Sequence, residues 1–577
     1  MTTERWEAVV LGTGFGGAIN SARLAKRWPG KVLVLERGKR YPMGSFPRSP
    51  RAFSRNFWNI PEEDRTRPDA MTEEEQHGLF DIRNFEKLDA VFCAGLGGGS
   101  LIYANVFLEP PANILDGPRW PGTCRKSDLD PYYAVAKEVL GSRPIPSADD
   151  DPRRHIQRTE LFQQVAGEMG RKSRLVDLNV FFGNDFDSPL PIGVQARNRY
   201  GALQTSCVYS AECDVGCNTH SKNTLDLNYL HVAENRYQAD VRTERLVHKI
   251  SPVDAEGNDD PAADGTHGYS VTFNDITTRP WVEERVLTNR VVVSAGSFGS
   301  TELLMRARDV YKTMPRISER LGEHLSGNGD FLSFVIDGDR PSNPNAGPVI
   351  TQRIDFNLFE DFDEDRAFIL EDAGYPAFLA WFTEGVQPRL GWLDPIAKAG
   401  KSVIGELFQK GKSAGRAGEA FEDLLGGADL SYDTSVLLCM GIDKSNGTMF
   451  LGSDGAIDAS WPLEESRPLY DAIVAAGEEF QKKTGGNFVA LPTWWPPFRR
   501  NVTVHALGGC VLSDGPETGV TSAGPATFGK LFGYENLWVA DGSIVPTAVG
   551  ANPTATISAL CERVAEGITG IKPDADL

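Results

Sequence analysis

Short apolar runs rich in valine and leucine alternate along this chain with glycine-rich turns and helical patterns. Residues 8–11 form one such run, and residues 31–36 form another, Lys-Val-Leu-Val-Leu-Glu. Because each run is short and continuous, each predicts a strand that is buried on both faces. The residues between the two runs predict a glycine turn followed by a helix.

The same order of elements returns in the middle of the chain and near its C-terminal end. A strand, a small-residue turn and a helix start are predicted from Arg290 onward, and a further strand from Leu537 leads to a helix that starts near Asn552. Residues 242–250 and 269–273 favour antiparallel or irregular structure instead. These units predict one discontinuous α/β domain, interrupted by a second domain.

The turn after the first strand has the glycine spacing that a dinucleotide requires. Gly12 allows a tight turn, Gly14 lets the backbone approach a pyrophosphate, and Gly17 lets the helix pack closely on the strand. The N-terminus of that helix offers unpaired N–H groups to phosphates. Glu36 ends the second strand, where a carboxylate accepts hydrogen bonds from a ribose diol. These residues predict nucleotide binding; the alternative is a purely structural glycine turn.

Length and charge limit the classes of function. The chain has 577 residues, which exceeds one hydrophobic core, so two domains are expected. The formal net charge of −20 argues against nucleic acid as a partner, because nucleic acid is a polyanion. The first strand leaves no room for a signal sequence, and no apolar run is long enough to span a bilayer. We therefore expect a cytoplasmic location and no transmembrane segment.

Three further motifs follow the first glycine loop in order. Residues 94–105 read Ala-Gly-Leu-Gly-Gly-Gly-Ser-Leu-Ile-Tyr-Ala-Asn, residues 505–510 read His-Ala-Leu-Gly-Gly-Cys, and residues 550–553 read Gly-Ala-Asn-Pro. The glycines in the first of these have no side chains, so their backbone can lie against a flat ring system. With the first loop, these motifs resemble those of the glucose-methanol-choline (GMC) oxidoreductases. The chain is most similar to the branch of bacterial cholesterol oxidases that bind FAD without a covalent bond.

The resemblance runs from residue 8 to about residue 566 and implies the fold class, α/β with mixed α+β character. A Rossmann-like FAD-binding domain would comprise residues 1–44, 90–110, 223–330 and 500–577. A substrate-binding domain with a mixed or antiparallel sheet and helices would comprise residues 45–89, 111–222 and 331–499.

The resemblance also implies how FAD is held. The pyrophosphate and the adenosine ribose would lie against Gly12, Gly14, Gly17 and Glu36, and Val247 matches a strand whose backbone contacts the adenine. The residues expected beside the isoalloxazine and the ribityl chain are Gly97, Gly98, Gly99, Ser100, Asp541 and Gly542. The helix that opens at Pro553 would aim its N-terminus at the flavin pyrimidine edge, where its dipole favours negative charge.

His505 and Asn552 match the catalytic pair of the family. A histidine can orient the substrate hydroxyl or take its proton near neutral pH, and the Asn552 amide can hold the substrate oxygen. Glu371 falls where the cholesterol-oxidase branch has a carboxylate above the substrate; Asp372 is the alternative counterpart, and a plain surface acid is a third interpretation. Cys510, in the histidine motif, is expected to pack under the glycine turn.

Two positions depart from the cholesterol-oxidase pattern. Thr554 stands where those enzymes have an aromatic residue after Asn-Pro, which puts oxygen access or the fit of a sterol in doubt. Tyr103 stands where they have asparagine, which alters the flavin face.

Three of the eight cysteines lie within eleven residues, at Cys207, Cys213 and Cys217, with His220 close behind. Thiolates at short spacing suit iron–sulfur or zinc, and the spacing is similar to that of flavin sugar dehydrogenases that carry a three-iron cluster. The alternative is a structural loop held by packing or a disulfide. An iron–sulfur cluster is therefore one hypothesis for this segment.

Residues 392–424 place apolar side chains at helical spacing and also carry several lysines. A surface helix that packs inward is one interpretation, and a lid over the substrate that makes peripheral membrane contact is the other. The aromatic run that begins at Trp494 either lines a bulky substrate site or belongs to the core.

The sequence thus predicts an FAD-dependent oxidoreductase that transfers hydride from an alcohol carbon to flavin N5. The expected substrate is a bulky apolar alcohol, such as a sterol or a long-chain or aryl alcohol. The acceptor is oxygen or an external electron carrier, and Thr554 together with the cysteines favours a dehydrogenase slightly. The rivals are a lyase of the same fold that cleaves cyanohydrins without redox, a non-catalytic flavoprotein, and a nicotinamide dehydrogenase.

Overall fold

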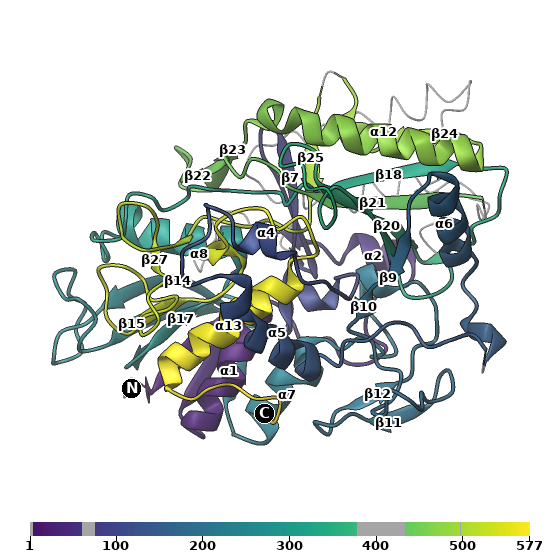
Figure 1. The fold of residues 1–577 in the computed structure, drawn as a ribbon. Coiled ribbons are helices and arrows are strands. Elements are labelled where there is room, and N and C mark those ends of the chain that lie inside the picture. Colours follow the sequence, from purple (N-terminus) through teal and green to yellow (C-terminus); the bar gives the residue numbers. More distant parts are fainter. Residues whose placement is uncertain (1–3, 60–75, 150, 378–432, 497) are drawn as a thin grey trace.

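A parallel five-stranded sheet joins the three predicted strand-and-helix units (Figure 1). The computed structural model describes residues 4–59, 76–149, 151–377, 433–496 and 498–577. The strand order is β13 (Asp240–Arg242), β3 (Val32–Leu35), β2 (Ala8–Leu11), β17 (Val291–Val293) and β28 (Leu537–Val539), and every pair is parallel. All residues of β2, β3, β17 and β28 are buried, which is typical of a parallel sheet that is covered on both faces.

Helices from opposite ends of the chain lie side by side, and the N-terminal one packs on this sheet. α1 (Phe15–Arg27) contacts α13 (Thr554–Thr569), and α13 in turn contacts α5 (Lys126–Val139) (Figure 1). Arg23 of α1 and Glu562 of α13 form a buried ion pair at 2.8 Å. The discontinuous α/β unit predicted from the apolar pattern is therefore present.

A four-stranded sheet follows the order β1 (Arg5–Trp6), β16 (Val282–Thr288), β15 (Tyr269–Asp275) and β14 (Arg245–Pro252). β14, β15 and β16 are antiparallel, with an irregularity in β14 between Val247 and Lys249. The antiparallel structure expected for residues 242–250 and 269–273 is thus confirmed from Arg245 onward, whereas Arg242 ends the parallel strand β13.

The second large sheet is antiparallel and belongs to the other part of the chain. Its order is β24 (Asn487–Ala490), β18 (Phe331–Ile336), β21 (Ser435–Gly441), β20 (Phe368–Ala373), β19 (Ile350–Phe356) and β9 (Ser173–Leu175). Among the described helices, α12 (Arg467–Thr484) and α6 (Gln157–Glu168) contact this sheet (Figure 1). α12 buries Leu469, Ile473 and Phe480 at helical spacing.

Shorter elements connect these layers. A three-stranded sheet has the order β25 (Asn501–Thr503), β7 (Leu88–Cys93) and β6 (Phe80–Asn84). The remaining named strands and α-helices are α2 (Pro50–Ser54), β4 (Trp58–Asn59), β5 (Gln76–His77), β8 (Val106–Phe107), α4 (Ala112–Leu115), β10 (Asp177–Leu178), β11 (Gln195–Arg197), β12 (Leu203–Thr205), α7 (Tyr229–Asn235), α8 (Gly296–Met305), β22 (Thr448–Leu451), β23 (Ile457–Ser460), β26 (Leu512–Ser513) and β27 (Thr521–Ser522).

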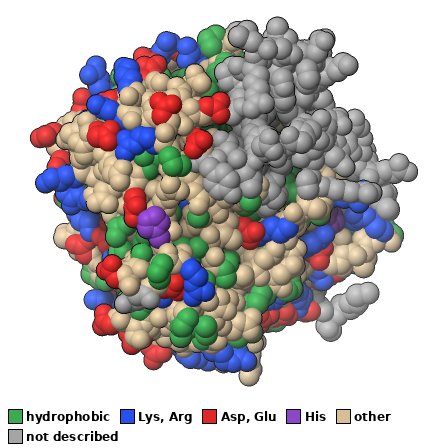
Figure 2. Space-filling view, turned by 90° about the vertical axis from the view of Figure 1, so that its right-hand side faces the viewer, with side chains coloured by type: hydrophobic (Ala, Val, Ile, Leu, Met, Phe, Trp, Pro, Cys, Tyr) green, Lys and Arg blue, Asp and Glu red, His purple; other side chains and the backbone are tan. Residues whose placement is uncertain are grey.

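The strands of the five-stranded sheet all fall in the ranges predicted for an FAD-binding domain, and those of the six-stranded sheet fall in the other ranges. On the face seen in Figure 2, Lys and Arg side chains are interspersed with Asp and Glu. Within the described ranges, no helix combines the length and hydrophobicity needed to cross a bilayer.

Candidate active site

A cavity of about 610 Å³ is lined by residues from both the parallel and the six-stranded sheets. One part, which we call the glycine end, is lined by Gly12, Gly14, Glu36, Gly98 and Gly99 among others. The other part, the histidine end, is lined by Tyr103, Asp214, Leu332, Phe334, Val349, Val436, Leu438, His505 and Asn552. The structure therefore brings both glycine loops and the predicted catalytic pair to one cavity.

Close backbone approaches shape the first glycine loop. Gly12 has φ +96°, and a Cβ atom there would lie 2.3 Å from the carbonyl oxygen of Ser294. A Cβ at Gly17 would lie 2.0 Å from the Gly12 carbonyl oxygen, so the helix does pack tightly on the turn. A Cβ at Gly14 would meet no protein atom within 4 Å, because this residue faces the cavity.

Gly16 has a packing role that the sequence analysis missed. A Cβ at this position would lie 1.6 Å from the carbonyl oxygen of Ala540, just after β28. The contact between α1 and the C-terminal strand therefore requires glycine here as well. The sequence feature that could have indicated this role is the glycine pair at residues 16 and 17, because only Gly17 is needed for the dinucleotide spacing.

Glu36 lies at the end of β3 and lines the cavity. Its carboxylate accepts hydrogen bonds from the backbone N–H of Thr13 at 3.0 Å and of Gly38 at 2.8 Å, and from the Thr13 hydroxyl. Burial raises the pKa of Glu36, and these donors oppose the rise. The carboxylate thus also fixes the glycine turn, and its place at the strand end suits the predicted ribose contact.

The second glycine loop touches the first. A Cβ at Gly98 would lie 2.5 Å from the Cα of Gly14, whereas a Cβ at Gly99 would meet open space in the cavity. Ser100 turns the other way: its hydroxyl donates to the Gly97 carbonyl at 2.7 Å and accepts from the N–H of Leu225 at 3.1 Å. Gly98 and Gly99 thus expose backbone to the cavity, while the hydrogen bonds of Ser100 stabilise the loop on its other side.

Asp541 and Gly542 line the cavity beside the N-terminus of α13. The Asp541 carboxylate accepts from the N–H groups of Gly296 at 2.9 Å and Ser543 at 2.8 Å, and burial raises its pKa. Pro553 is the N-cap of α13 and provides no side-chain hydrogen bond to the helix, so the first N–H groups lack a side-chain cap. Val247 lies on β14 and lines the same cavity.

His505 is held by an acid that the sequence analysis did not identify. Its Nδ1 lies 2.7 Å from Oδ1 of Asp330, while Oδ2 of Asp330 accepts from the Thr503 hydroxyl and the Val504 N–H, each at 2.9 Å. Asp330 is buried. Because the acid and the histidine lie 175 residues apart, no local motif links them. An imidazole that donates from Nδ1 leaves Nε2 as a proton acceptor.

Asn552 lines the cavity, and its amide Nδ2 donates to Glu371 at 3.3 Å. Glu371 is fully buried on β20 and is not among the cavity-lining residues, so it lies behind Asn552 rather than facing a substrate. Burial raises its pKa to about 8, against the opposing Asn552 hydrogen bond. Asp372 accepts from the N–H groups of Thr351 and Gln352 instead, so Glu371 is the acid beside Asn552.

Asp214, which the sequence analysis did not select, also lines the histidine end. Burial raises its pKa to about 6, and the charges of Lys222, His505 and Arg158 oppose the rise. Tyr103 lines the same end and meets Phe15 edge-on at 5.7 Å, and Thr554 lines the cavity as well. Both departures from the cholesterol-oxidase pattern thus border the cavity.

The structure does not support the iron–sulfur hypothesis. No group of three or more His, Cys, Asp or Glu side chains able to hold a metal ion occurs in the described part of the chain, which includes Cys207, Cys213 and Cys217. Burial raises the pKa of Cys213 to about 11 and that of Cys207 well above its usual range, which disfavours the thiolate form that metals require. All eight cysteines are free, and two of these three pack in an apolar cluster.

Two other predictions concern segments away from the cavity. Residues 392–424, the predicted amphipathic insertion, lie outside the described residues. Trp494 packs in the core, with its ring centroid 5.1 Å from that of Phe331 and 5.2 Å from that of Tyr470. The aromatic run therefore contributes to the core through Trp494. Cys510 is also fully buried, as expected.

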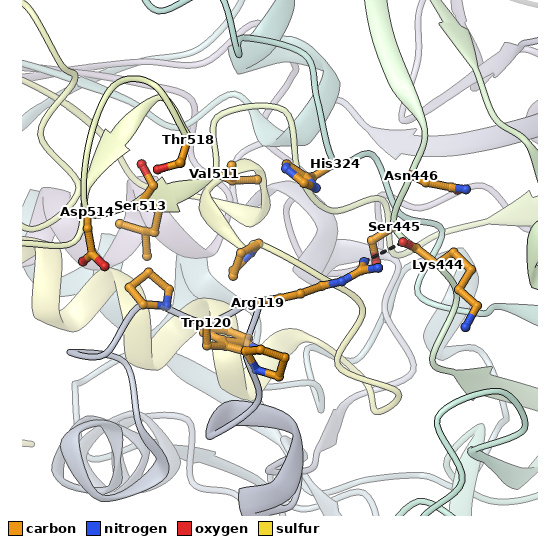
Figure 3. A pocket seen from close by; sticks show the side chains of 14 residues that line it. Arg119, Trp120, His324, Lys444, Ser445, Asn446, Val511, Ser513, Asp514 and Thr518 are labelled. Carbon is orange, nitrogen blue, oxygen red and sulfur yellow. Dashed lines mark hydrogen bonds between the residues drawn. The ribbon is translucent and has the colours of Figure 1, made fainter.

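A second pocket contains none of the predicted site residues (Figure 3). It has a volume of about 400 Å³, and its lining includes Arg119, His324 and Lys444. The guanidinium of Arg119 points across the pocket and donates to the Lys444 carbonyl at 2.5 Å. The Lys444 ammonium donates a hydrogen bond to the Asp365 carboxylate. The side chains of Arg119 and Lys444 are thus engaged with neighbouring chain segments.

The cavity residues fit FAD. The bare backbone at Gly14 and Gly99 and the uncapped start of α13 are the cradle and the donors that a dinucleotide needs. The acid at the end of β3 is the acceptor that a ribose diol needs. The first turn of α1 has an N-cap, Gly14, without a side-chain hydrogen bond, which leaves N–H groups for phosphates.

Comparison with known proteins agrees with this geometry. Models of the GMC oxidoreductase family match residues 88–326 and residues 474–561, together more than half of the chain. A cholesterol oxidase of Acinetobacter baumannii is 25% identical over 97% of this chain and 93% of its own length. A cholesterol oxidase of Mycobacterium tuberculosis is 26% identical over 97% and 90%, respectively.

Solved structures show the same fold. A pyridoxine 4-oxidase from Mesorbium loti has a TM-score of 0.58 at 14% identity, covering 97% of this chain and 98% of its own. A fungal aryl-alcohol oxidase has a TM-score of 0.59 at 14% identity, covering 99% of each chain. This chain is therefore an oxidoreductase that belongs to the GMC oxidoreductase family, a family that binds FAD.

Proposed function

We propose that this chain binds FAD in the cavity and oxidises a bulky apolar alcohol, with oxygen as the electron acceptor. The observation that carries the proposal is the shared cavity, in which His505 and Asn552 face the same space as the two glycine loops. FAD, when bound, would supply the acceptor for the hydride that leaves the hydroxyl-bearing carbon.

The chain's own residues would handle the proton and the orientation of the substrate. His505 is fixed through Nδ1 by Asp330, which leaves Nε2 to take the hydroxyl proton. Asn552 commits one amide hydrogen to Glu371, and no described residue hydrogen-bonds to its buried Oδ1. This amide would therefore hold the substrate hydroxyl beside His505.

The walls of the histidine end support an apolar substrate. Leu332, Phe334, Val349, Val436 and Leu438 line it. Burial of a substrate methylene against such walls contributes about 0.8 kcal/mol, so long aliphatic, aryl or sterol alcohols would bind better than short ones.

Oxygen is favoured over an electron carrier because the nearly full-length relatives are named as cholesterol oxidases and the cysteines offer no metal site within the described residues. The reaction would convert the alcohol and O₂ into a carbonyl compound and H₂O₂.

Anaerobic mixing of the purified protein with a panel of sterols and aliphatic and aryl alcohols tests the proposal. We expect a yellow protein whose flavin band bleaches with at least one alcohol, and one H₂O₂ for each alcohol oxidised once air is admitted. A band that stays oxidised while a cyanohydrin is cleaved would indicate the lyase. Bleaching without H₂O₂ would indicate an external electron carrier.

A further inference from the structure

Asp214 is an acid placed in the apolar part of the cavity. It belongs to a short 3-10 turn, Cys213–Val215, and lines the histidine end together with His505. Apart from His505, Asp214 and the amide of Asn552, the residues we assign to that end are apolar or aromatic. A carboxyl group in such surroundings is costly unless a partner hydrogen-bonds to it.

Within the described ranges, no residue provides that partner. Oδ1 of Asp214 is buried, and no described residue hydrogen-bonds to it. A buried acceptor without a donor costs about 1–3 kcal/mol. The turn is well anchored nevertheless, because Lys222 donates to the Cys213 carbonyl at 2.7 Å.

Lys222 and Arg158, two cations whose charges act on Asp214, are engaged elsewhere. Lys222 donates its other hydrogen bonds to the carbonyls of Leu101 at 3.1 Å and Tyr103 at 2.8 Å, which uses all three ammonium hydrogens. Arg158 donates to the carbonyls of Pro348 and Val349. Both cations therefore supply positive charge near Asp214 without a direct contact, so the acid is left as an open acceptor.

We propose that Asp214 accepts a hydrogen bond from a second donor group on the substrate, a hydroxyl or an ammonium on a carbon other than the one that is oxidised. This inference rests on the proposed function and narrows its substrate class to apolar alcohols that carry such a second donor. His505 and Asn552 would hold the reacting hydroxyl, the apolar walls would hold the hydrocarbon body, and Asp214 would hold the second donor group.

Substrates matched in chain length test the assignment. The panel is a long-chain primary alcohol, the diol with a second hydroxyl at the far end, and the corresponding amino alcohol. In the wild type we expect the two bifunctional substrates to have kcat/KM about 10- to 100-fold above the simple alcohol, the range expected for one buried hydrogen bond.

Two variants separate charge from hydrogen bonding. Asp214→Leu should abolish the preference, so that kcat/KM for the diol and the amino alcohol falls to the value for the simple alcohol. Asp214→Asn keeps an acceptor, so it should retain part of the preference for the diol but lose that for the amino alcohol. The matched control is Glu212→Gln, an acid two residues away that pairs with Arg48 and is not among the cavity-lining residues; it should behave like the wild type.

A binding measurement keeps the test independent of turnover. An alkylamine without a hydroxyl should perturb the flavin absorbance of the wild type with an affinity about tenfold or more above that for Asp214→Leu. Flavin content reports whether each variant is folded.

Equal kcat/KM for all three substrates in the wild type and in Asp214→Leu, with equal alkylamine affinity, would overturn the role of Asp214 and leave alcohol oxidation standing. If no alcohol bleaches the flavin, the proposed function fails instead, and the alkylamine titration still decides whether Asp214 binds a donor.

Discussion

The glycine end of the cavity is built from backbone, whereas the histidine end is built from side chains that distant segments bring together. At the glycine end, Gly14 and Gly99 present bare main chain, and Gly12 and Gly17 permit contacts that a Cβ would block. At the histidine end, His505 depends on Asp330, and Asn552 contacts Glu371. A site made of backbone leaves a local motif in the sequence, and a site made of long-range side-chain pairs does not.

Gly14→Val tests the glycine end and should have the largest effect. The new side chain would point into the space that the pyrophosphate is proposed to fill, so FAD affinity should fall by about 100-fold or more. The measurement is flavin bound per purified chain. The matched control is Gly167→Val on α6, an exposed glycine whose Cβ would also meet nothing within 4 Å; it should keep its flavin. A yellow Gly14→Val protein would place the cofactor elsewhere.

His505→Ala tests the histidine end. Turnover should fall by roughly 10²–10⁴-fold, because the proton acceptor is lost, while FAD stays bound. Stopped-flow reduction by the best alcohol measures the step. His267→Ala, at an exposed histidine outside the cavity, serves as control and should leave the rate unchanged. An unaltered rate in His505→Ala would show that the base is another group.

Asp330→Asn tests whether the histidine end depends on a buried partner. The amide oxygen can still accept from Thr503 and Val504, but the ring of His505 loses the carboxylate that holds its Nδ1–H. The reduction rate should fall by about 10- to 100-fold. Flavin content and Tm should change little. A fall in Tm without a change in rate would make Asp330 a purely structural residue.

Glu371→Gln tests the acid behind Asn552 through the pH dependence of stability. Burial raises the pKa of Glu371 from 4.5 to about 8, so between those pH values the folded state keeps a proton that the unfolded state has released. The free energy of unfolding should therefore fall as pH rises, by up to about 1.4 kcal/mol per pH unit.

The glutamine variant lacks this titration. From pH 5 to pH 8 the Tm of the wild type should decline relative to that of Glu371→Gln. Glu360→Gln, at an exposed acid paired with Arg174, is the control and should track the wild type. Parallel Tm curves for the wild type and Glu371→Gln would contradict a buried, protonated Glu371.

The sequence predicted the fold where the physical signal was local. The parallel strands were recognisable because burial on both faces requires continuous apolar runs, as at β2 and β3. The six-stranded sheet was expected only as a mixed or antiparallel sheet, because its strands lie between residues 173 and 490 without a repeating turn signal.

Part of the candidate site was also predictable, because some of its residues belong to local sequence motifs. Gly12, Gly14, His505 and Asn552 belong to short motifs, and all line the cavity. Asp330 and Asp214 were missed because nothing beside them in the sequence marks them; only tertiary contacts bring them to His505 and the cavity. The cysteine spacing left both a metal cluster and a structural loop open, and the fold buries two of those thiols among apolar side chains.

The position of β28 has a consequence for biosynthesis. This strand pairs with β17, which itself pairs with β2, and the α13 that follows it covers α1. A ribosome must therefore deliver nearly the whole polypeptide before this sheet receives its last strand and α1 receives its covering helix. Premature termination anywhere upstream of Leu537 would leave a nascent product with an exposed apolar sheet edge, a ready substrate for chaperones and proteases.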